Sequence, residues 1–252
     1  MTKFEDRTAA EALPGTAWLD SARGRGILGR LSDELVAALI RGAQRVEYPA
    51  GSVGLRYDET PKAAIVLNGT LRSFISYPDG SQATTRYLRA GDLTGVFAPR
   101  RPVLARGVQA IAQSELLFVA AERIRELALA EPSFAWALIE ELTTVLNLTQ
   151  RAMYLRAFAT VRQRVVCAIV DRATASGALR VGQTVVGTQQ DLAIAVGSVR
   201  EVVATTLGSL KHEGLVDLRR GGLVMPSNHS NEPSASSQRM IRPSARCSQM
   251  RS

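Results

Sequence analysis

The sequence is poor in the side chains that carry most metal and thiol chemistry. Its 252 residues contain two histidines, His212 and His229, and two cysteines, Cys167 and Cys247. Residues 1–166 contain neither type, which excludes histidine-ligated metals, thiolate iron–sulfur clusters, cysteine nucleophiles and histidine general bases from that part of the chain. We interpret both histidines as solvated surface residues and Cys167 as a small core residue. With no catalytic constellation, we expect a protein that is not an enzyme.

Long apolar runs are missing as well. No stretch of 18 or more apolar residues occurs, and the first residues, MTKFEDRTAAEALPG, carry acids where a signal peptide has its apolar segment. Two cysteines that lie far apart cannot build a disulfide framework or a four-ligand zinc site. These absences predict a cytoplasmic protein with no membrane partner.

The composition is that of a folded chain with a tail. A length of 252 residues favours two modest domains, and 46% hydrophobic residues suffice for ordinary cores. The net charge of +8 suits a polyanionic partner but equally suits a plain globular protein, so charge alone decides nothing. Residues 227–252 are rich in serine and poor in apolar side chains, which predicts a disordered tail. The first 22 residues are predicted to be a flexible lead-in.

The segment from Val46 to Val119 consists of short apolar or alternating runs separated by turn signals. Such spacing predicts many short strands in an antiparallel barrel or jelly roll. The stretch Tyr77–Ser81 (YPDGS) is a strong hairpin signal, because proline presets one turn dihedral and glycine accepts a positive one. Before these strands, Leu31–Ile40 predicts a short helix with Ser32 as N-cap.

After Glu122 the apolar period becomes helical, and a long helix is predicted to begin at Pro132. Its apolar residues follow one another at steps of three and four: Leu138, Leu142, Val145, Leu148, Ala152 and Leu155. This seam is typical of a helix that packs against another helix. Spacing alone also allows a helix that faces the core of its own domain. We favour a two-fold dimer contact, because so long a helix has little of its own domain to cover.

Residues 188–213 predict two short helices that meet at Gly197. Two capping boxes mark the expected starts, Thr188 with Asp191 and Ser198 with Glu201. Apolar residues at helical spacing give the two helices a shared face: Leu192, Ala193, Val196, Val203, Leu207 and Leu210. A hairpin with its tip at Arg219–Gly222 follows, which completes a winged helix-turn-helix. The alternative is a helical hairpin that packs on a protein partner.

The chain resembles the Crp/Fnr family of bacterial transcription regulators over about residues 30–226. The match is densest in T-Q-Q-D-L-A-x-x-V-G-S-V-R-E-V-V-x-x-x-L-x-x-L-x-x-E-G-L-V, residues 188–216. Upstream, four glycines and an aspartate fall where the family's sensor barrel turns: Gly51, Gly69, Gly80, Gly91 and Asp92. The resemblance implies an α+β fold with a sensor β-barrel at 23–130, a dimerisation helix at 131–160 and a winged helix-turn-helix at 161–226.

The resemblance also implies roles for single residues. Arg200 would read a guanine in the major groove and Glu201 a cytosine, within an inverted-repeat operator. Contacts to phosphates or to the groove would come from Thr188, Gln189, Gln190, Ser198 and Thr205. Thr205 stands where well-known members have a second arginine, and Val199 and Val202 replace hydroxyl residues, so the operator sequence stays open. Arg200 and Glu201 could instead be an ordinary solvated pair on a helix face.

The resemblance is weakest in the sensor pocket. Val96 replaces the glutamate that binds the ribose of a cyclic nucleotide, and the expected arginine position falls at Leu104. An apolar side chain cannot accept that hydrogen bond, so cyclic AMP is not the expected effector. The barrel also lacks the ligands for haem and iron–sulfur sensing. The nearby cluster of Arg100, Arg101 and Arg106 would bind another small anion or form a solvated loop.

Three hypotheses remain. The chain is a homodimeric, sequence-specific regulator of double-stranded DNA, with RNA polymerase as a candidate partner. Alternatively, it is a ligand-binding signalling module that acts through protein contacts. A metalloenzyme on the same barrel is nearly excluded by the missing histidines.

Overall fold

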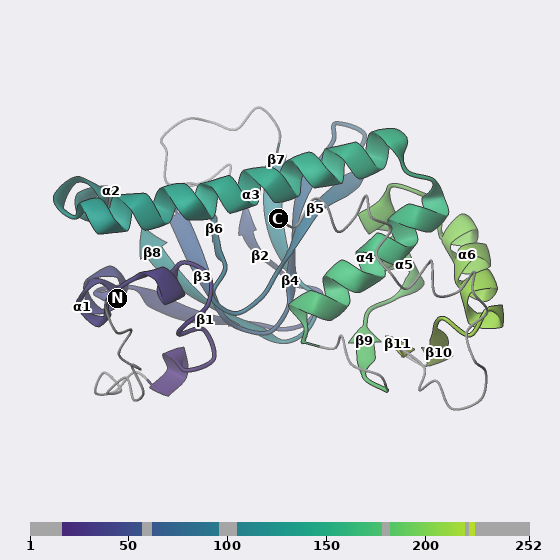
Figure 1. The fold of residues 1–252 in the computed structure, drawn as a ribbon, viewed down its shortest axis with the longest axis horizontal. Helices are drawn as coiled ribbons and strands as arrows, with labels where there is room; N and C mark the ends of the chain where they lie inside the picture. The colour runs from purple at the N-terminus through teal and green to yellow at the C-terminus, as the bar shows by residue number, and fades with distance from the viewer. Residues whose placement is uncertain (1–16, 57–61, 96–104, 178–181, 220–221, 225–252) are drawn as a thin grey trace, which may run out of the picture. The chain divides into compact units, whose positions relative to one another are not determined.

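The computed structural model describes residues 17–56, 62–95, 105–177, 182–219 and 222–224 (Figure 1). Two compact units make up the structure, one of Met1–Asp79 with Tyr87–Val145 and the other of Gly80–Arg86 with Leu146–Ser252. Residues 1–16 of the expected flexible N-terminus, the serine-rich tail, Val96, Leu104, Arg100 and Arg101 lie outside the described residues. Flexibility was expected as far as residue 22, but Leu19 and Ala22 are completely buried in the core, so the prediction was wrong for residues 17–22.

The N-terminal part of the chain is built on two antiparallel sheets of four strands each, which belong to the first unit except for Gln82–Arg86 of β5. The first sheet has the order β1-β8-β3-β6 and the second the order β2-β7-β4-β5. The strands are β1 (Gln44–Tyr48), β2 (Val53–Arg56), β3 (Lys62–Asn68), β4 (Leu71–Ser76), β5 (Gln82–Leu88), β6 (Leu93–Gly95), β7 (Ala105–Ala110) and β8 (Ser114–Ala120). The predicted barrel of short antiparallel strands is thus confirmed, and the Tyr77–Ser81 turn lies between β4 and β5 as expected.

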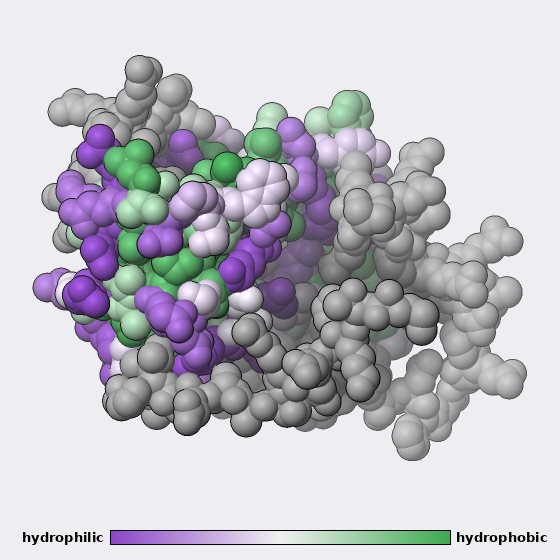
Figure 2. Space-filling model, turned by 60° about the vertical axis from the view of Figure 1, so that its left-hand side comes forward, coloured by the Kyte–Doolittle hydropathy of each residue, from purple (hydrophilic) through white to green (hydrophobic). Residues whose placement is uncertain are grey.

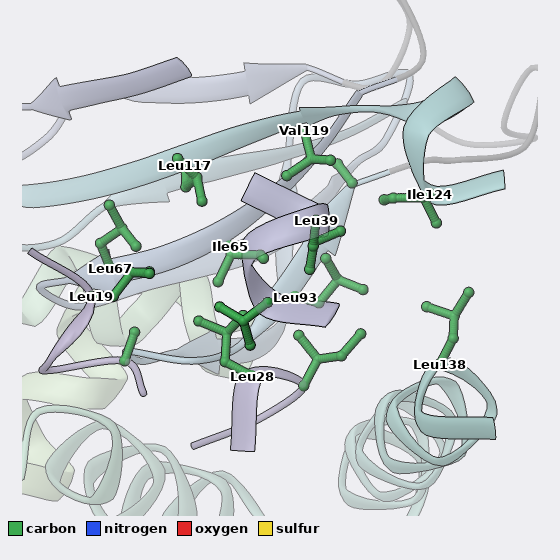
Figure 3. Close-up of a cluster of buried hydrophobic side chains, with 14 of the residues drawn as sticks. Leu19, Leu28, Leu39, Ile65, Leu67, Leu93, Leu117, Val119, Ile124 and Leu138 are labelled. Atoms are coloured by element: carbon green, nitrogen blue, oxygen red, sulfur yellow. The ribbon is translucent and has the colours of Figure 1, made fainter. Parts of the chain in front are cut away.

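Alternation along β3 divides the core of this unit in two. Ala64 and Val66 join one cluster with side chains of the second sheet, such as Leu71 and Val108. Ile65 and Leu67 point the opposite way, because successive side chains of a strand lie on opposite faces. They join the larger cluster of Figure 3, in which Leu19, Leu28, Leu39, Leu93, Leu117, Val119, Ile124 and Leu138 are labelled.

Short helices close this second cluster. They are two 3₁₀ turns, η1 (Ala17–Leu19) and η2 (Leu28–Arg30), the helix α1 (Asp33–Ile40) and the helix α2 (Ala121–Ala130). Ser32 caps α1 as predicted, with its hydroxyl accepting from the backbone N–H of Leu35. Gly26 and Gly91 approach so closely that a Cβ on Gly26 would lie 2.0 Å from the carbonyl oxygen of Gly91. Only glycine fits this approach.

The long helix α3 (Pro132–Phe158) has 27 residues and is the longest helix of the described chain (Figure 1). Its first turns bury Phe134, Ala137 and Leu138 in the core of the first unit. Glu141 is also buried there and accepts from Nη1 of Arg30 at 2.7 Å. This part of α3 therefore packs as a core helix of its own unit.

The second unit is a three-helix cluster with a small sheet. It contains α4 (Val161–Ala175), β9 (Thr184–Val186), α5 (Gln189–Val196), α6 (Arg200–His212), β10 (Asp217–Arg219) and β11 (Gly222–Val224). The predicted hairpin is confirmed by the antiparallel pairing of β10 with β11, in the register Arg219 to Gly222. β11 also pairs with β9, so the strand order is β10-β11-β9.

The core of the second unit contains the whole predicted apolar face of α5 and α6, together with Val165 and Ile169 of α4. Cys167, which we expected in this core, is only half-buried and lies outside the buried cluster, so that prediction was wrong. No single described helix is long and apolar enough to span a membrane. The helices α5 and α6 meet such a criterion only as a bent pair.

Candidate nucleic-acid interface

The start of α5 is fixed by the capping box that the sequence predicts at Thr188. The Thr188 hydroxyl accepts from the backbone N–H of Asp191 at 3.1 Å, and the Asp191 carboxylate accepts from the backbone N–H of Thr188 at 2.8 Å. Two backbone donors at the helix N-terminus are satisfied in this way. The other backbone donors of the first turn have no partner within the helix, so an anion can accept from them.

The end of α5 is fixed at Gly197, which has the left-handed dihedrals φ 62° and ψ 54°. The backbone N–H of Ser198 donates to the carbonyl oxygen of Ala193 at 3.0 Å, which is the long bond of a Schellman motif. Arg164 of α4 donates from Nη1 to the carbonyl oxygen of Val196 at 2.6 Å. The turn between the two helices is therefore held by its own backbone and by a neighbouring helix.

The predicted second capping box, Ser198 with Glu201, is wrong. The helix α6 begins at Arg200, and its N-cap is Val199, whose side chain makes no capping hydrogen bond. The reason lies in the preceding turn, because the backbone N–H of Ser198 is engaged in ending α5. The helix starts one residue later than predicted, so Glu201 is its second residue rather than its third.

The helix α6 is anchored along one side and at its C-terminal end. Val203, Leu207 and Leu210 are buried in the core of the unit. At the far end, Nη2 of Arg162 in α4 lies 2.6 Å from a carboxylate oxygen of Glu213. This arginine holds the pKa of the Glu213 carboxyl below its usual range. Anchored in this way, α6 makes an angle of 108° with α5, which is the geometry of a helix-turn-helix.

The side of α6 that faces away from the core carries the predicted reading residues. Arg200, Glu201 and Thr205 are exposed, and neither Arg200 nor Glu201 forms an ion pair with another described residue. Thr205 turns its hydroxyl inward and donates to the carbonyl oxygen of Glu201 at 3.0 Å. Two consecutive residues in the first turn of α6 thus carry a guanidinium and a carboxylate without an ion-pair partner among the described residues, where they can meet the edges of bases.

The remaining predicted contact residues surround the two helix starts. Thr188 and Gln190 are exposed, while Gln189 and Ser198 are half-buried. The structure brings all seven predicted residues to the two helix N-termini of one unit. Sequence reasoning missed the residues that position them, Arg162 and Arg164. Their partners lie 51 and 32 residues away, and no local pattern marks such contacts.

The predicted anion cluster is only partly within the described chain. Arg106 lies on β7 with its side chain exposed, and Arg100 and Arg101 are outside the described residues. Within the described ranges, no group of three or more histidine, cysteine or acidic side chains could hold a metal ion.

A second surface of functional interest runs along α3. Its most exposed apolar residues include Trp136, Ile139, Leu142, Leu146 and Met153. Most of these recur at steps of three, four or seven, so they form one stripe along the helix. Figure 2 shows one face of the molecule, on which exposed hydrophobic groups are interspersed among hydrophilic ones.

This stripe differs from the seam that the sequence predicted, with Leu142 as the shared residue. Leu138 is buried in the core of the first unit, and Val145, Ala152 and Leu155 are half-buried. Leu148, which also belongs to the predicted seam, is 38% exposed. The first residue of the predicted seam therefore packs in the core of the first unit, and the dimer contact stays a prediction.

Comparisons with known proteins agree with this architecture. Vfr, the cAMP-activated global transcriptional regulator of Pseudomonas aeruginosa, is 26% identical over 167 residues, which are 64% of this chain and 78% of Vfr. CLP, the c-di-GMP responsive global regulator of Xanthomonas campestris, superposes with a TM-score of 0.67 at 21% identity, over 78% of this chain and 100% of CLP. A Crp/Fnr family transcriptional regulator from Thermus thermophilus superposes with a TM-score of 0.60 at 23% identity, over 73% of this chain and 94% of that regulator.

No family model matches the chain. The fold nevertheless defines a class, since these solved structures share two N-terminal antiparallel sheets followed by C-terminal helices. The chain has the fold of these Crp/Fnr regulators, in agreement with the resemblance that its motif at residues 188–216 carries. The proteins to which it is similar are transcription regulators.

Proposed function

We propose that this chain is a homodimeric transcription regulator that binds an inverted-repeat DNA site in a sequence-specific way. The observation that carries the proposal is the pair Arg200 and Glu201. Both are exposed at the start of α6, and the Gly197 turn sets this helix at 108° to α5. A helix-turn-helix places its second helix in the major groove, with the N-terminal residues on the base edges.

Each exposed group has a chemical counterpart in the groove. The guanidinium of Arg200 donates to O6 and N7 of a guanine, and the carboxylate of Glu201 accepts from the amino group of a cytosine. Thr188, Gln189, Gln190 and Ser198 surround the helix N-termini, where side chains and backbone N–H groups bind phosphates and set the register. Thr205 adds a short side chain one turn further along α6.

Dimerisation rests on the α3 stripe. An apolar stripe that includes Ile139, Leu142 and Leu146 needs a partner, and the same stripe of a second copy is self-complementary about a two-fold axis. Two recognition helices related in this way would enter major grooves about 34 Å apart, which fits an inverted repeat. RNA polymerase is the partner through which such a regulator would act on transcription.

A small effector other than cyclic AMP fits the sensor unit best. Vfr is cAMP-activated and CLP is c-di-GMP responsive, but this chain has Val96 where cyclic AMP binding needs a glutamate. Arg106, with Arg100 and Arg101, provides positive charge for an anionic ligand. A panel of nucleotides, including cyclic di-GMP, and small anions tests this. A ligand should shift both DNA affinity and thermal stability, and constitutive DNA binding is the better interpretation if none shifts either.

The test of DNA binding is in vitro selection of duplex fragments by the purified protein, followed by titration of the selected site. We expect an inverted repeat, and Arg200→Ala should lose about 1–3 kcal/mol of discrimination at one base pair per half-site. Arg125→Ala is the matched control, since this exposed arginine lies on α2 in the other unit. Equal affinity for selected and scrambled duplexes would contradict the proposal. Absence of duplex binding at low salt would instead favour a module that contacts proteins.

A further inference from the structure

Two exposed valines lie near Arg200 and Glu201 in the sequence and have no part in the proposed DNA contacts described above. Val199 is 60% exposed and Val202 is 42% exposed, whereas the next residue, Val203, is completely buried in the core. Val199 and Val202 are three positions apart at the start of α6, so they lie near each other, in the turn that also carries Arg200 and Glu201.

Helix stability does not account for either valine. Val199 is the N-cap of α6, a position at which serine, threonine, aspartate and asparagine are strongly preferred because their side chains can bond the free backbone donors. Val202 lies in the first turn, where a β-branched apolar residue is a weaker helix former than alanine. A contribution to helix stability therefore does not explain the two valines. Their exposed apolar groups lie in the same helical turn as Arg200.

A third side chain extends this apolar edge. Thr205 follows Val202 by three positions, and its hydroxyl donates to the carbonyl oxygen of Glu201 at 3.0 Å. With its proton committed to the backbone, Thr205 presents mainly its methyl group beside Val202. The outward side of the first two turns thus combines one cation and one anion with a row of methyl groups.

We infer that Val199 and Val202 contact the 5-methyl groups of thymines next to the base pair that Arg200 reads. This inference rests on the proposed function. The thymine methyl is the apolar group that base edges present in the major groove, and aliphatic side chains recognise it by contact. The valines extend the reading surface from hydrogen-bonding groups to this methyl, so each half-site should contain thymine at one or two fixed positions.

The experiment replaces each thymine of the selected site by deoxyuridine, which removes the methyl and leaves base pairing unchanged. Burial of one methyl group changes affinity about fourfold, so the wild-type protein should bind about fourfold more weakly per lost contact. Val202→Ala and Val199→Ala should each bind more weakly to the thymine site and lose the difference between thymine and deoxyuridine at one position. Val202→Thr keeps the shape of the side chain and should lose part of that difference.

Val53→Ala serves as the matched control, because Val53 is 40% exposed on β2 in the other unit. It should keep both the affinity and the methyl effect. If no deoxyuridine weakens wild-type binding, or if the methyl effect persists in both alanine variants, the inference is wrong while sequence-specific binding stands. If wild-type protein binds selected and scrambled duplexes equally, the proposed function fails and the inference fails with it.

Discussion

Arg164 of α4 donates from Nη1 to the carbonyl oxygen of Val196 at a distance of 2.6 Å. Val196 is the last residue of α5, and its carbonyl has no partner within that helix. The bond satisfies this group and also ties α4 to the turn from which α6 starts. The direction in which Arg200 and Glu201 project therefore depends on a residue far from the reading face.

Replacing Arg164 by methionine tests this dependence. Methionine keeps an apolar stem of similar length but cannot donate a hydrogen bond. We expect a loss of about 1–3 kcal/mol in the free energy of unfolding, which is typical of a hydrogen bond to a charged group. Urea denaturation measures the loss, and Arg125→Met, at an exposed site on α2, should stay within about 0.5 kcal/mol of wild type. Equal urea midpoints for Arg164→Met and Arg125→Met would show that the hydrogen bond from Arg164 to Val196 does not contribute to the free energy of unfolding.

Gly197→Ala should destabilise the chain by about 1–2 kcal/mol. The cost comes from the backbone, because φ is 62° and the nearest atom to an added Cβ, Nη1 of Arg164, lies 3.8 Å away. Gly208→Ala is the opposite-sign control, since Gly208 lies within α6 with open space around it and no positive φ. Alanine there should stabilise by about 0.5–1 kcal/mol. Thermal unfolding of both variants measures these opposite changes in stability. A Gly197→Ala variant as stable as wild type would show that alanine at this position causes no backbone strain.

In this helix-turn-helix, the sequence could predict only those features that depend on residues close together in the chain. The box at Thr188 was found because all its atoms lie within four residues. The box at Ser198 was predicted by the same rule and failed, because the end of α5 and the start of α6 compete for the same backbone. The contact of Arg164 with Val196 joins residues 32 positions apart and could not be read locally.

The sequence could not assign each residue of α3 to its packing partner, for a different reason. Periodicity shows that a helix packs on something but does not say on which partner. Leu138 fits the predicted seam and lies in the core of the first unit, whereas Leu146 does not fit it and is exposed. Only the three-dimensional arrangement separates the side of α3 that its own unit covers from the side that stays open.

The ion pair of Arg162 with Glu213 predicts a pH dependence of stability. The hydrogen bond from Arg162 lowers the pKa of the Glu213 carboxyl below the value of 4.5 for a free glutamate. Because the folded pKa is the lower one, the stabilisation is present above pH 4.5 and is lost as the pH falls through the folded pKa. Its size is modest, since both side chains are about a third exposed.

Glu213→Gln measures this contribution. At pH 7 the variant should unfold at a lower urea concentration than wild type, and the difference should shrink as the pH falls from 4.5 through the folded pKa. Glu131→Gln replaces an exposed glutamate at the end of α2 and is the matched control, which should stay within about 0.5 kcal/mol of wild type at pH 7. A difference between wild type and Glu213→Gln that stayed constant down to pH 3 would mean that the pair is not responsible.

Leu146→Glu tests whether the α3 stripe joins two copies of the chain. Leu146 is 56% exposed, so a glutamate there should leave the single chain folded but place two like charges near the two-fold axis. We expect wild type to sediment as a dimer and the variant as a monomer. Leu129→Glu is the control, because Leu129 is 74% exposed on α2, outside the stripe, and should leave the dimer intact.

The DNA-binding consequence of Leu146→Glu separates assembly from recognition. A monomer keeps its α6, so its affinity for an isolated half-site should equal that of the wild-type protein. It should lose the additional affinity for the full inverted repeat, because that gain comes from holding two reading helices at a fixed spacing. A variant that sediments as a dimer, or a monomer that still binds the repeat as tightly as wild type, would show that the stripe is not the contact on which operator binding depends.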